Sequence, residues 1–332
     1  LCILAKNGFF HEWLLLSNVS VPILTDLSGN FNIAIAEKVK YNGENVKKRR
    51  MIMTRQDFSE LTRQGVVLLD GATGSWLMRH GMPRGVCTEQ WVLDHPQVLQ
   101  QLQRGYLEAG TQLLLAPTFS ANRYSLGRHG LADRTVEMNK RLMALSLEVA
   151  DGRVPVAGEM TTTGEPMEPK GSMSQEELFD IYREQARALA EAGADLIVIE
   201  TMLAVDETVT ALEAAQSIYS LPVVCSLTVQ TDGTAYFGGN CFDALETLQT
   251  LGAAAVGLNC SYGPEQMLPL ISRMARRAHV PLMAKPNAGM PTLTPDGVAV
   301  YPMDAESFAR ETVKLAEAGA KLVGGCCGTT PE

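Results

Sequence analysis

The sequence predicts a (β/α)₈ barrel of the TIM-barrel type, an α/β fold, because short apolar runs alternate with amphipathic helical stretches from residue 66 onward. Eight such runs occur, each short enough to be a buried parallel strand. Four of the helical stretches end in a glycine directly before the next strand, at Gly110, Gly193, Gly252 and Gly319. Eight strand and helix units over roughly 260 residues match the size of a closed barrel.

The expected elements follow one another along the chain in this repeating order. The eight apolar runs that we interpret as strands are residues 66–70, 112–117, 154–159, 195–200, 222–227, 254–259, 281–285 and 321–324. The amphipathic stretches that we interpret as helices are residues 97–109, 134–150, 175–192, 206–218, 244–251, 264–278 and 305–318. A doubly wound open sheet is the alternative, but no G-x-G-x-x-G motif follows the first strand.

Both ends of the chain depart from the repeat. Residues 1–52 show no steady period, do not begin with Met, and end in a basic run beside Met51 and Met53. Because two consecutive arginines can be encoded by AGGAGG, a bacterial ribosome-binding sequence, we expect initiation at Met53 and a non-native or disordered extension over residues 1–52. A genuine flexible extension is the alternative. The barrel domain would then cover residues 53–332.

The last expected helix is missing from the repeat. Thr330 followed by Pro331 is typical of a helix N-terminus, so a helix would be starting where the sequence stops. We therefore expect a truncated chain that lacks the eighth helix and exposes apolar surface beside the first and eighth strands.

Composition narrows the classes of function. A net charge of −9 and a pI near 5.2 argue against a nucleic-acid partner, which needs a basic face. The apolar stretch at residues 1–27 is interrupted by charged residues, so we expect neither a transmembrane helix nor a signal peptide, and no membrane partner. Seven cysteines, an odd number, favour a reduced compartment, and we expect a cytoplasmic protein.

Chemistry in such a barrel is expected where the strands end, because active sites form at the carboxyl ends of the strands. The residues that close the apolar runs are polar and rich in sulfur. They are Asp70, Gly71, Glu159, Glu200, Asn259, Cys260, Asn287, Cys326 and Cys327.

Three cysteines at this rim predict a zinc site. The vicinal pair Cys326 and Cys327, together with Cys260, would supply three thiolates and leave one position open, as in catalytic zinc sites. Zinc is thiophilic and lowers the pKa of a bound thiol, so the open position suits a thiol substrate and favours alkyl transfer over hydrolysis. The alternatives are buried small side chains or a redox-active vicinal disulfide. We assign a structural role to the other cysteines, Cys2, Cys87, Cys225 and Cys241.

Carboxylates at the same rim predict an amine site. Asp70 and Glu200 close the first and fourth strands, from where they could bind the α-amino group of a substrate across the pocket. Alternatively, Asp70 caps a turn and Glu200 is a solvated strand end. Glu159 is a weaker candidate, and Asn259 and Asn287 could orient metal ligands or fill turns.

Taken with their neighbours, these residues resemble the homocysteine S-methyltransferase family, and within it the homocysteine-binding module of cobalamin-dependent methionine synthase. The resemblance runs from about residue 66 to the end. The segments that carry it are Leu69-Asp-Gly-Ala-Thr-Gly-Ser75, Glu108-Ala-Gly to Thr118-Phe119, Gly257-Leu-Asn-Cys-Ser261, Lys285-Pro-Asn-Ala-Gly289 and Gly324-Gly-Cys-Cys-Gly-Thr-Thr-Pro331.

The resemblance implies roles for individual residues. It implies Zn²⁺ on Cys260, Cys326 and Cys327, with Asn287 in the fourth position until the substrate thiol displaces it. It also implies contacts with the homocysteine amine around Asp70, Gly71 and Glu200, and it places Thr88 and Glu159 among the substrate-binding residues. Two segments depart from the family pattern: residues 158–164, and Cys87-Thr88, where betaine-using relatives carry Trp-Thr, which disfavours betaine as donor.

The implied reaction is zinc-dependent methyl transfer to L-homocysteine, giving methionine. Because the chain has no D-x-H-x-x-G cobalamin motif, methylcobalamin and 5-methyltetrahydrofolate would act on corrinoid and folate domains or partner proteins. S-methylmethionine or S-adenosylmethionine is the alternative donor. A non-catalytic zinc- or thiol-binding module is a further alternative.

Overall fold

The computed structural model describes residues 53–294 and 299–332, so the predictions for residues 1–52 lie outside the described residues. Parallel strands form one eight-stranded sheet in the order β1-β10-β7-β6-β5-β4-β3-β2. These strands are β1 (Val67–Leu68), β2 (Leu114–Leu115), β3 (Val156–Met160), β4 (Leu196–Met202), β5 (Val223–Leu227), β6 (Ala255–Cys260), β7 (Leu282–Pro286) and β10 (Ala320–Val323). A parallel bridge between Leu69 and Leu113 joins the edge strands β1 and β2 and closes the barrel. The predicted fold is confirmed.

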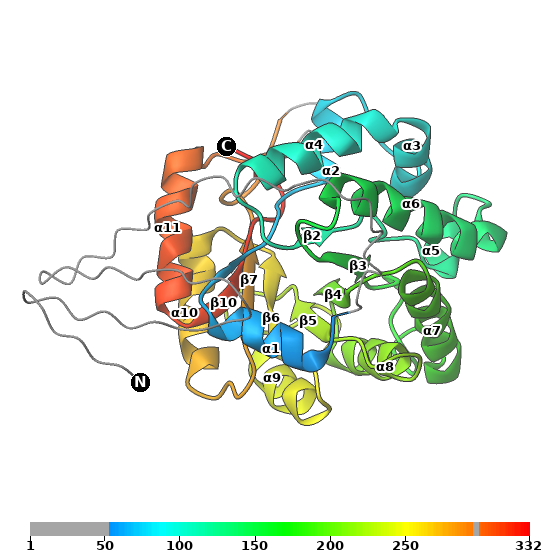
Figure 1. The fold of residues 1–332 in the computed structure, drawn as a ribbon. Coiled ribbons are helices and arrows are strands. Elements are labelled where there is room, and N and C mark those ends of the chain that lie inside the picture. The colour runs from blue at the N-terminus through cyan, green and yellow to red at the C-terminus, as the bar shows by residue number, and fades with distance from the viewer. Residues whose placement is uncertain (1–52, 295–298) are drawn as a thin grey trace, which may run out of the picture. The chain divides into compact units, whose positions relative to one another are not determined.

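All seven predicted helices are present, with bounds within a few residues of those expected, and they surround the strands (Figure 1). They are α4 (Pro96–Glu108), α6 (Thr135–Ala150), α7 (Gln175–Glu191), α8 (Val205–Gln216), α9 (Cys241–Thr250), α10 (Pro264–Ala275) and α11 (Ala305–Glu317). The short elements were not predicted. They are α1 (Arg55–Arg63), α2 (Gly74–Arg79), α3 (Thr88–Asp94), α5 (Arg123–Gly127), the 3₁₀ helix Ala132–Arg134 and the hairpin of β8 (Thr292–Leu293) and β9 (Ala299–Val300).

Local sequence fixes where the long helices begin and end. The Ser174 hydroxyl accepts a hydrogen bond from the Glu177 amide at the start of α7, and Asp304 caps α11 in the same way. The four predicted glycine stops all have positive φ, from +85° at Gly252 to +118° at Gly319. A left-handed residue at this point ends a helix with little strain only if it is glycine, so the chain can turn into the next strand.

The barrel interior is a separate apolar core that closes one end of the barrel. Val67, Leu69, Leu113 and Leu115 point into it from β1, β2 and the residues beside them, and Phe58 of α1 packs among them. Burying such a phenylalanine contributes about 2–3 kcal/mol. Because α1 precedes β1 and covers the amino-terminal end of the barrel, the carboxyl ends of the strands are left to form the pocket.

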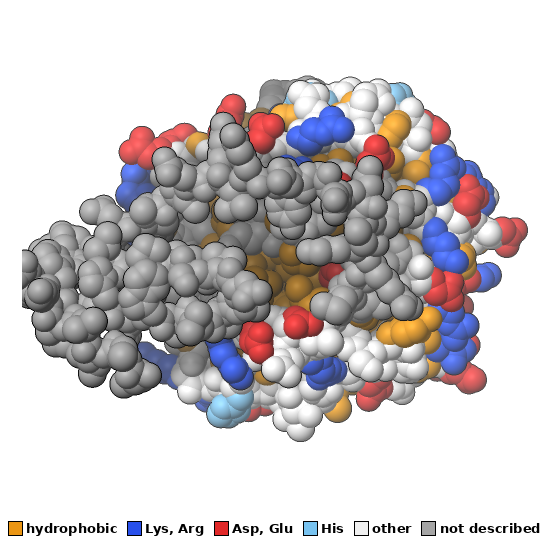
Figure 2. Space-filling model, viewed as in Figure 1, with side chains coloured by type: hydrophobic (Ala, Val, Ile, Leu, Met, Phe, Trp, Pro, Cys, Tyr) orange, Lys and Arg blue, Asp and Glu red, His pale blue; other side chains and the backbone are white. Residues whose placement is uncertain are grey.

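Two apolar side chains at the first strand lie partly exposed on the outer surface. Leu68, on the outward face of β1, is 40% exposed, and the preceding Val66 is 43% exposed. On the face shown in Figure 2, acidic and basic side chains are interspersed. Among the described residues, no helix has both the length and the apolar character needed to cross a membrane.

Candidate active site

The three predicted metal-binding cysteines lie together. Cys260 is the last residue of β6, and Cys326 and Cys327 follow β10; their Sγ atoms all lie within 4.8 Å of one another. Three sulfurs bound to one tetrahedral metal at about 2.3 Å would be about 3.8 Å apart, so the cluster fits a zinc ion with small adjustments. In the part of the chain that the structure describes, no other group of three such side chains could hold a metal.

A left-handed backbone presents the Cys260 thiol to the cluster. Cys260 and Ser261 have φ values of 58° and 59°, which costs about 1 kcal/mol or more for each residue with a side chain. The buried Asn259 side chain ties this segment to neighbouring strands: its Oδ1 accepts from the Thr201 amide at 2.8 Å and from the Ser226 hydroxyl at 2.7 Å. The strained turn is therefore held by hydrogen bonds to β4 and β5.

Close backbone contacts position the vicinal cysteines. The Cys326 amide donates to the Pro286 carbonyl at 2.8 Å. A Cβ on Gly324 would lie 2.6 Å from the Asp70 carbonyl oxygen, and a Cβ on Gly325 would lie 2.4 Å from the Thr329 hydroxyl. Glycine is needed here because the loop after β10 passes directly against the end of β1.

The pKa values of the clustered thiols are shifted in opposite directions. Hydrogen bonds from Cys260 and then Cys326 hold the pKa of Cys327 well below its ordinary value, and the Tyr301 hydroxyl adds another. The same contacts, with burial, raise the pKa of Cys326. These contacts favour the thiolate form of Cys327, which is the form of cysteine that binds a metal.

Asn287 lies directly beside the cluster. Its side chain is buried, and its Oδ1 accepts a hydrogen bond from the Cys327 amide at 3.0 Å. This contact fixes the amide side chain against the vicinal pair. A role for Asn287 as fourth metal ligand stays a prediction.

A cavity of about 870 Å³ joins the thiol cluster to the predicted amine site. The predicted residues that line it are Asp70, Gly71, Thr88, Glu159, Glu200, Cys260, Cys326 and Cys327. Lining residues that sequence reasoning did not single out include Ser75, Met78, Arg79, Glu89, Phe119, Lys285 and Tyr301. The strand-end rule thus locates the three cysteines and three of the carboxyl groups, whereas most of the other lining residues were not predicted.

Asp70 offers an unsatisfied acceptor to this cavity. Its carboxyl is 4% exposed; Oδ2 accepts from the Leu115 amide at 2.8 Å, whereas Oδ1 has no hydrogen-bond partner among the described residues. Burial raises the pKa of Asp70 to about 7, although the charge of Lys285 opposes the shift. A ligand cation would both satisfy Oδ1 and favour the ionised form.

Glu200 is already paired. Its Oε2 lies 2.7 Å from Nζ of Lys285, and both side chains are buried. Burial by itself lowers the pKa of Lys285, but the field of Glu200, Asp70 and Glu159 outweighs it and raises the pKa. Burial, and next the charge of Glu200, raises the pKa of Glu159 well above its ordinary value, which favours a protonated Glu159 carboxyl hydrogen-bonded to Glu200.

Lys285 and Tyr301, two pocket residues that were not predicted, differ in whether the sequence alone could have identified them. Lys285 closes the seventh apolar run, so its position alone could have identified it. Tyr301 lies in an irregular segment after β9, yet its ring packs against Gly328, where an added Cβ would be 2.3 Å from Cγ. No local pattern predicts that contact, because the two residues meet only in the folded chain.

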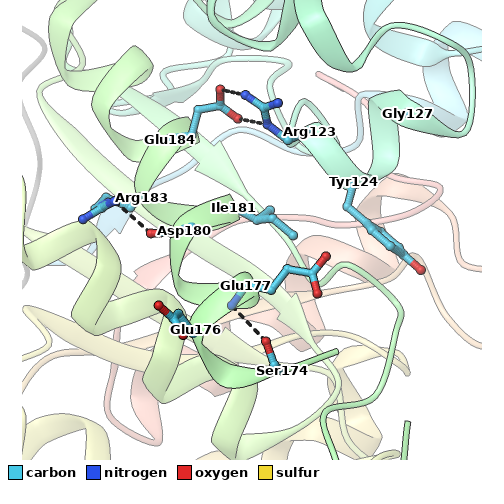
Figure 3. Close-up of a pocket in the computed structure, with 10 residues that line it drawn as sticks. All are labelled: Arg123, Tyr124, Gly127, Ser174, Glu176, Glu177, Asp180, Ile181, Arg183 and Glu184. Carbon is cyan, nitrogen blue, oxygen red and sulfur yellow. Dashed lines mark hydrogen bonds and ion pairs between the residues drawn. The ribbon is translucent and has the colours of Figure 1, made fainter. Parts of the chain in front are cut away.

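A second cavity, of about 810 Å³, lies at the surface between α5 and α7 (Figure 3). Its arginines are already engaged: Arg123 pairs with Glu184, and Arg183 pairs with Asp180 at 2.8 Å. Ser174 is used as a helix cap. Both arginines of this cavity are thus paired, so the site at the barrel mouth is the better candidate for chemistry.

A (β/α)₈ barrel with three clustered thiols and a buried acidic pocket at its mouth defines a class of barrel proteins that act on small molecules. A sequence profile described as homocysteine S-methyltransferase matches residues 67–332. The chain therefore belongs to the homocysteine S-methyltransferase family and is a methyltransferase, as the resemblance predicted.

Individual proteins give the same result. Methionine synthase of Mycobacterium leprae (strain TN) is 33% identical over 294 residues, which cover 83% of this chain and 24% of that protein. Methionine synthase of Mycobacterium tuberculosis (strain ATCC 25618 / H37Rv) is 33% identical over 293 residues, with the same coverage. The chain thus spans about a quarter of the length of these relatives.

Among solved structures, the metallated form of the homocysteine methyltransferase MmuM from Escherichia coli has the same fold. Its TM-score is 0.69 at 22% identity, and the match covers 82% of this chain and 95% of that one.

Proposed function

We propose that this chain transfers a methyl group to the thiol of L-homocysteine, giving methionine, with Zn²⁺ held by Cys260, Cys326 and Cys327. The observation that supports this most strongly is that one cavity contains both the three-thiol cluster and the acidic pocket. A molecule with a thiol at one end and an ammonium group at the other would match both ends of the cavity.

Different residues would bind the ammonium group, the rest of the amino acid and the metal. Asp70 would accept a hydrogen bond from the substrate ammonium group, because its Oδ1 is buried without a partner among the described residues. Gly71, Thr88 and Glu159 line the same space and would complete the contacts around the amino acid. Bound zinc would supply Lewis acidity that favours the ionised form of the substrate thiol. Asn287, held beside Cys327, would fill the fourth zinc position before substrate enters.

We further propose that the methyl donor is methylcobalamin, recharged from 5-methyltetrahydrofolate, on other domains or partner proteins in the cytoplasm. Support comes from the relatives named methionine synthase, of which this chain matches about a quarter. Purified protein supplied with homocysteine and methylcobalamin should form methionine faster than with S-methylmethionine or S-adenosylmethionine. Equal or faster turnover with a sulfonium donor would contradict the corrinoid assignment.

The metal part of the proposal is tested by X-ray absorption at the zinc edge. Sulfur coordination should rise from three to four when homocysteine is added, because the substrate thiol takes the open position. Cys326→Ser should lose bound zinc, whereas Cys225→Ala, which alters a thiol buried in β5 away from the cluster, should retain it. Sulfur coordination that does not change on adding homocysteine would rule out direct thiol binding.

A further inference from the structure

The segment 324–329, which follows β10, packs directly against the segment 70–75, which follows β1. Glycine is needed on both sides of this contact. A Cβ on Gly324 would lie 2.6 Å from the Asp70 carbonyl oxygen, which also accepts a hydrogen bond from the Gly325 amide at 3.1 Å. A Cβ on Gly71 would lie 2.5 Å from the Thr329 hydroxyl. Because only glycine allows backbones to approach so closely, the two segments are held in contact along several residues.

The hydroxyl of Thr329 joins the two segments. Thr329 is 6% exposed, and its Oγ1 accepts a hydrogen bond from the Ala72 amide at 3.0 Å. The same hydroxyl donates to the Cys326 carbonyl at 2.8 Å. A hydroxyl can donate one hydrogen bond and accept others, so one group satisfies a buried amide of the first segment and a carbonyl of the second. Thr329 therefore fixes the backbone of a thiol-bearing residue against the backbone after β1.

A second hydrogen bond joins the same two segments. The Gly328 amide donates to Oγ of Ser75 at 3.0 Å. Gly71 and Ser75 line the main cavity on one side, and Cys326 and Cys327 line it on the other. The part of the cavity farthest in sequence from the thiols is thus hydrogen-bonded to the segment that carries them.

Binding of a metal would require a small movement of the segment after β10. The Sγ atoms of Cys260, Cys326 and Cys327 lie within 4.8 Å of one another. Sulfurs on one tetrahedral zinc ion would be about 3.8 Å apart, so the thiols must draw together. Because Thr329 is bonded to both the Cys326 carbonyl and the Ala72 amide, a shift of the Cys326 backbone reaches the segment after β1.

We propose that Thr329 couples metal binding to binding of the amino-acid end of the substrate, with Ser75 as a second link. With the three thiols drawn together, Thr329 holds the segment 70–75 in the conformation that receives the amino acid. The inference rests on the proposed function, because it needs a metal and an amino acid in one cavity. Thr329 is a positioning residue, since it lies behind the cavity wall and acts through Ala72 and Cys326.

A ligand without sulfur tests this coupling apart from direct binding of a thiol to the metal. L-norleucine has the amino-acid group of methionine but a methylene group in place of the sulfur. Isothermal titration calorimetry gives its Kd for the zinc-free and the zinc-loaded protein, and we call the ratio of these two Kd values the metal coupling. In the unaltered protein the metal coupling should be at least about fivefold, the lower end of the range for coupled sites. Norleucine should tighten zinc binding by the same factor, because coupling between two sites is reciprocal.

Substitutions at Thr329 separate its hydroxyl from its shape. Thr329→Val keeps the shape and removes both hydrogen bonds, so the metal coupling should fall below about twofold. Thr329→Ser keeps the hydroxyl and should retain the coupling. Thr312→Val is the matched control, because Thr312 is also a buried threonine but its hydroxyl, on α11, has no hydrogen-bond partner in the described part of the chain. A purely structural role of Thr329 would weaken norleucine binding equally with and without zinc and leave the ratio unchanged.

Circular dichroism checks that each variant folds with and without zinc. If Thr329→Val does not fold, Ser75→Ala replaces it, since it removes only the acceptor of the Gly328 amide and should lower the metal coupling at least about twofold. Equal metal coupling in the substituted and the unaltered protein would overturn the proposal, and so would an unaltered protein that binds norleucine equally, or not at all, in its two metal states. These results leave the proposed function standing, because the sulfur coordination of zinc with homocysteine tests it separately.

Discussion

At the scale of single residues, the buried polar side chains at the site differ in how many of their polar atoms have a hydrogen-bond partner. Asn259 is fully engaged, with hydrogen bonds to Thr201 and Ser226. Asp70 uses one carboxyl oxygen, and its buried Oδ1 has no hydrogen-bond partner among the described residues. A satisfied group stabilises the fold, whereas an unsatisfied one destabilises it until a ligand arrives. The two residues therefore predict opposite consequences of substitution.

Asp70 should make the ligand-free protein less stable as pH rises. Its pKa is about 7 in the fold, above the value of about 3.9 in an unfolded chain, so the protonated form is favoured on folding. The resulting stabilisation is complete below about pH 4 and is lost as pH rises through about 7. Asp70→Asn should remove this loss, which we expect to be about 2–3 kcal/mol between pH 5 and pH 8.

Urea unfolding at the two pH values measures the difference between Asp70→Asn and the unaltered protein. Asp232→Asn is a suitable control, because Asp232 is an exposed turn residue whose pKa is lowered by the Thr234 amide. A pH dependence that is the same in Asp70→Asn and the unaltered protein would show that Asp70 ionises normally in the fold.

Asn259→Ala should be strongly destabilising. The substitution leaves the Thr201 amide and the Ser226 hydroxyl without their acceptor at a fully buried position, at a cost of about 2–4 kcal/mol. Because the adjacent Cys260 is held in a left-handed conformation, its thiol should also be displaced and zinc retention reduced. Ser226→Ala removes one of the same hydrogen bonds and should cost about 1 kcal/mol. Similar free energies of unfolding for the two variants would contradict a central role for Asn259.

At the scale of elements, the long helices could be predicted from sequence and the short ones could not. Period, caps and terminal glycines are local signals, and they placed α7 within one residue of its observed bounds, Gln175–Glu191. Helices α2 and α5 contain only six and five residues, too few to show a period. Helix α1 is an exception, because its sequence does contain a local signal. Thr54 and Asp57 form a capping box, which could have predicted where this helix begins.

The same distinction holds for the site. The positions of strand ends can be predicted from local sequence, whereas contacts between side chains distant in sequence cannot. The carboxyl-end rule predicted that Cys260, Cys326 and Cys327 lie at one end of the barrel, because all eight parallel strands end there. The rule could not show that Glu200 is paired, because its partner Lys285 lies 85 residues away and the contact depends on side-chain direction. Nor could it show that Oδ1 of Asp70 lacks a hydrogen-bond partner within the part of the chain that the structure describes. The sequence thus predicts where the functional groups lie, but not which of them already have a hydrogen-bond or ion-pair partner.

The loop after β10 provides a test at this scale. Gly328 has a φ of +83°, and a Cβ there would lie 2.3 Å from the Tyr301 ring, so Gly328→Ala should displace Tyr301, whose hydroxyl hydrogen-bonds to Cys327. Gly81→Ala is the matched control, because Gly81 also has positive φ but nothing lies within 4 Å of its Cβ position. Both variants should lose about 1 kcal/mol from backbone strain.

Only Gly328→Ala should lose more than this and also bind zinc more weakly. Chemical unfolding gives the free energies, and zinc content after dialysis gives the retention. If both variants retain zinc equally, the packing of Tyr301 on Gly328 does not position the vicinal cysteines.

At the scale of the whole molecule, the three-thiol cluster links parts of the barrel that are distant in sequence. Cys260 ends β6, whereas Cys326 and Cys327 follow β10, and β7 lies between these two strands in the sheet. A metal bound to all three would tie the last strand, and through it β1, to the second half of the barrel. The stability of the domain is therefore expected to depend on the metal, because a ligand that binds only the folded state stabilises it.

Removing zinc should lower the melting temperature of the protein. At a free zinc concentration about 1,000 times its Kd, binding contributes about 4 kcal/mol, which corresponds to roughly 10 °C for a domain of this size. Differential scanning calorimetry with zinc and with a chelator measures the shift. Cys326→Ser should melt at the same temperature in both conditions, because two thiols hold zinc too weakly to stabilise the fold. Cys225→Ala should instead keep the full shift, since that thiol lies on β5 and outside the cluster. If the chelator leaves the melting temperature of the unaltered protein unchanged, the barrel is held closed by its strand pairing and core alone.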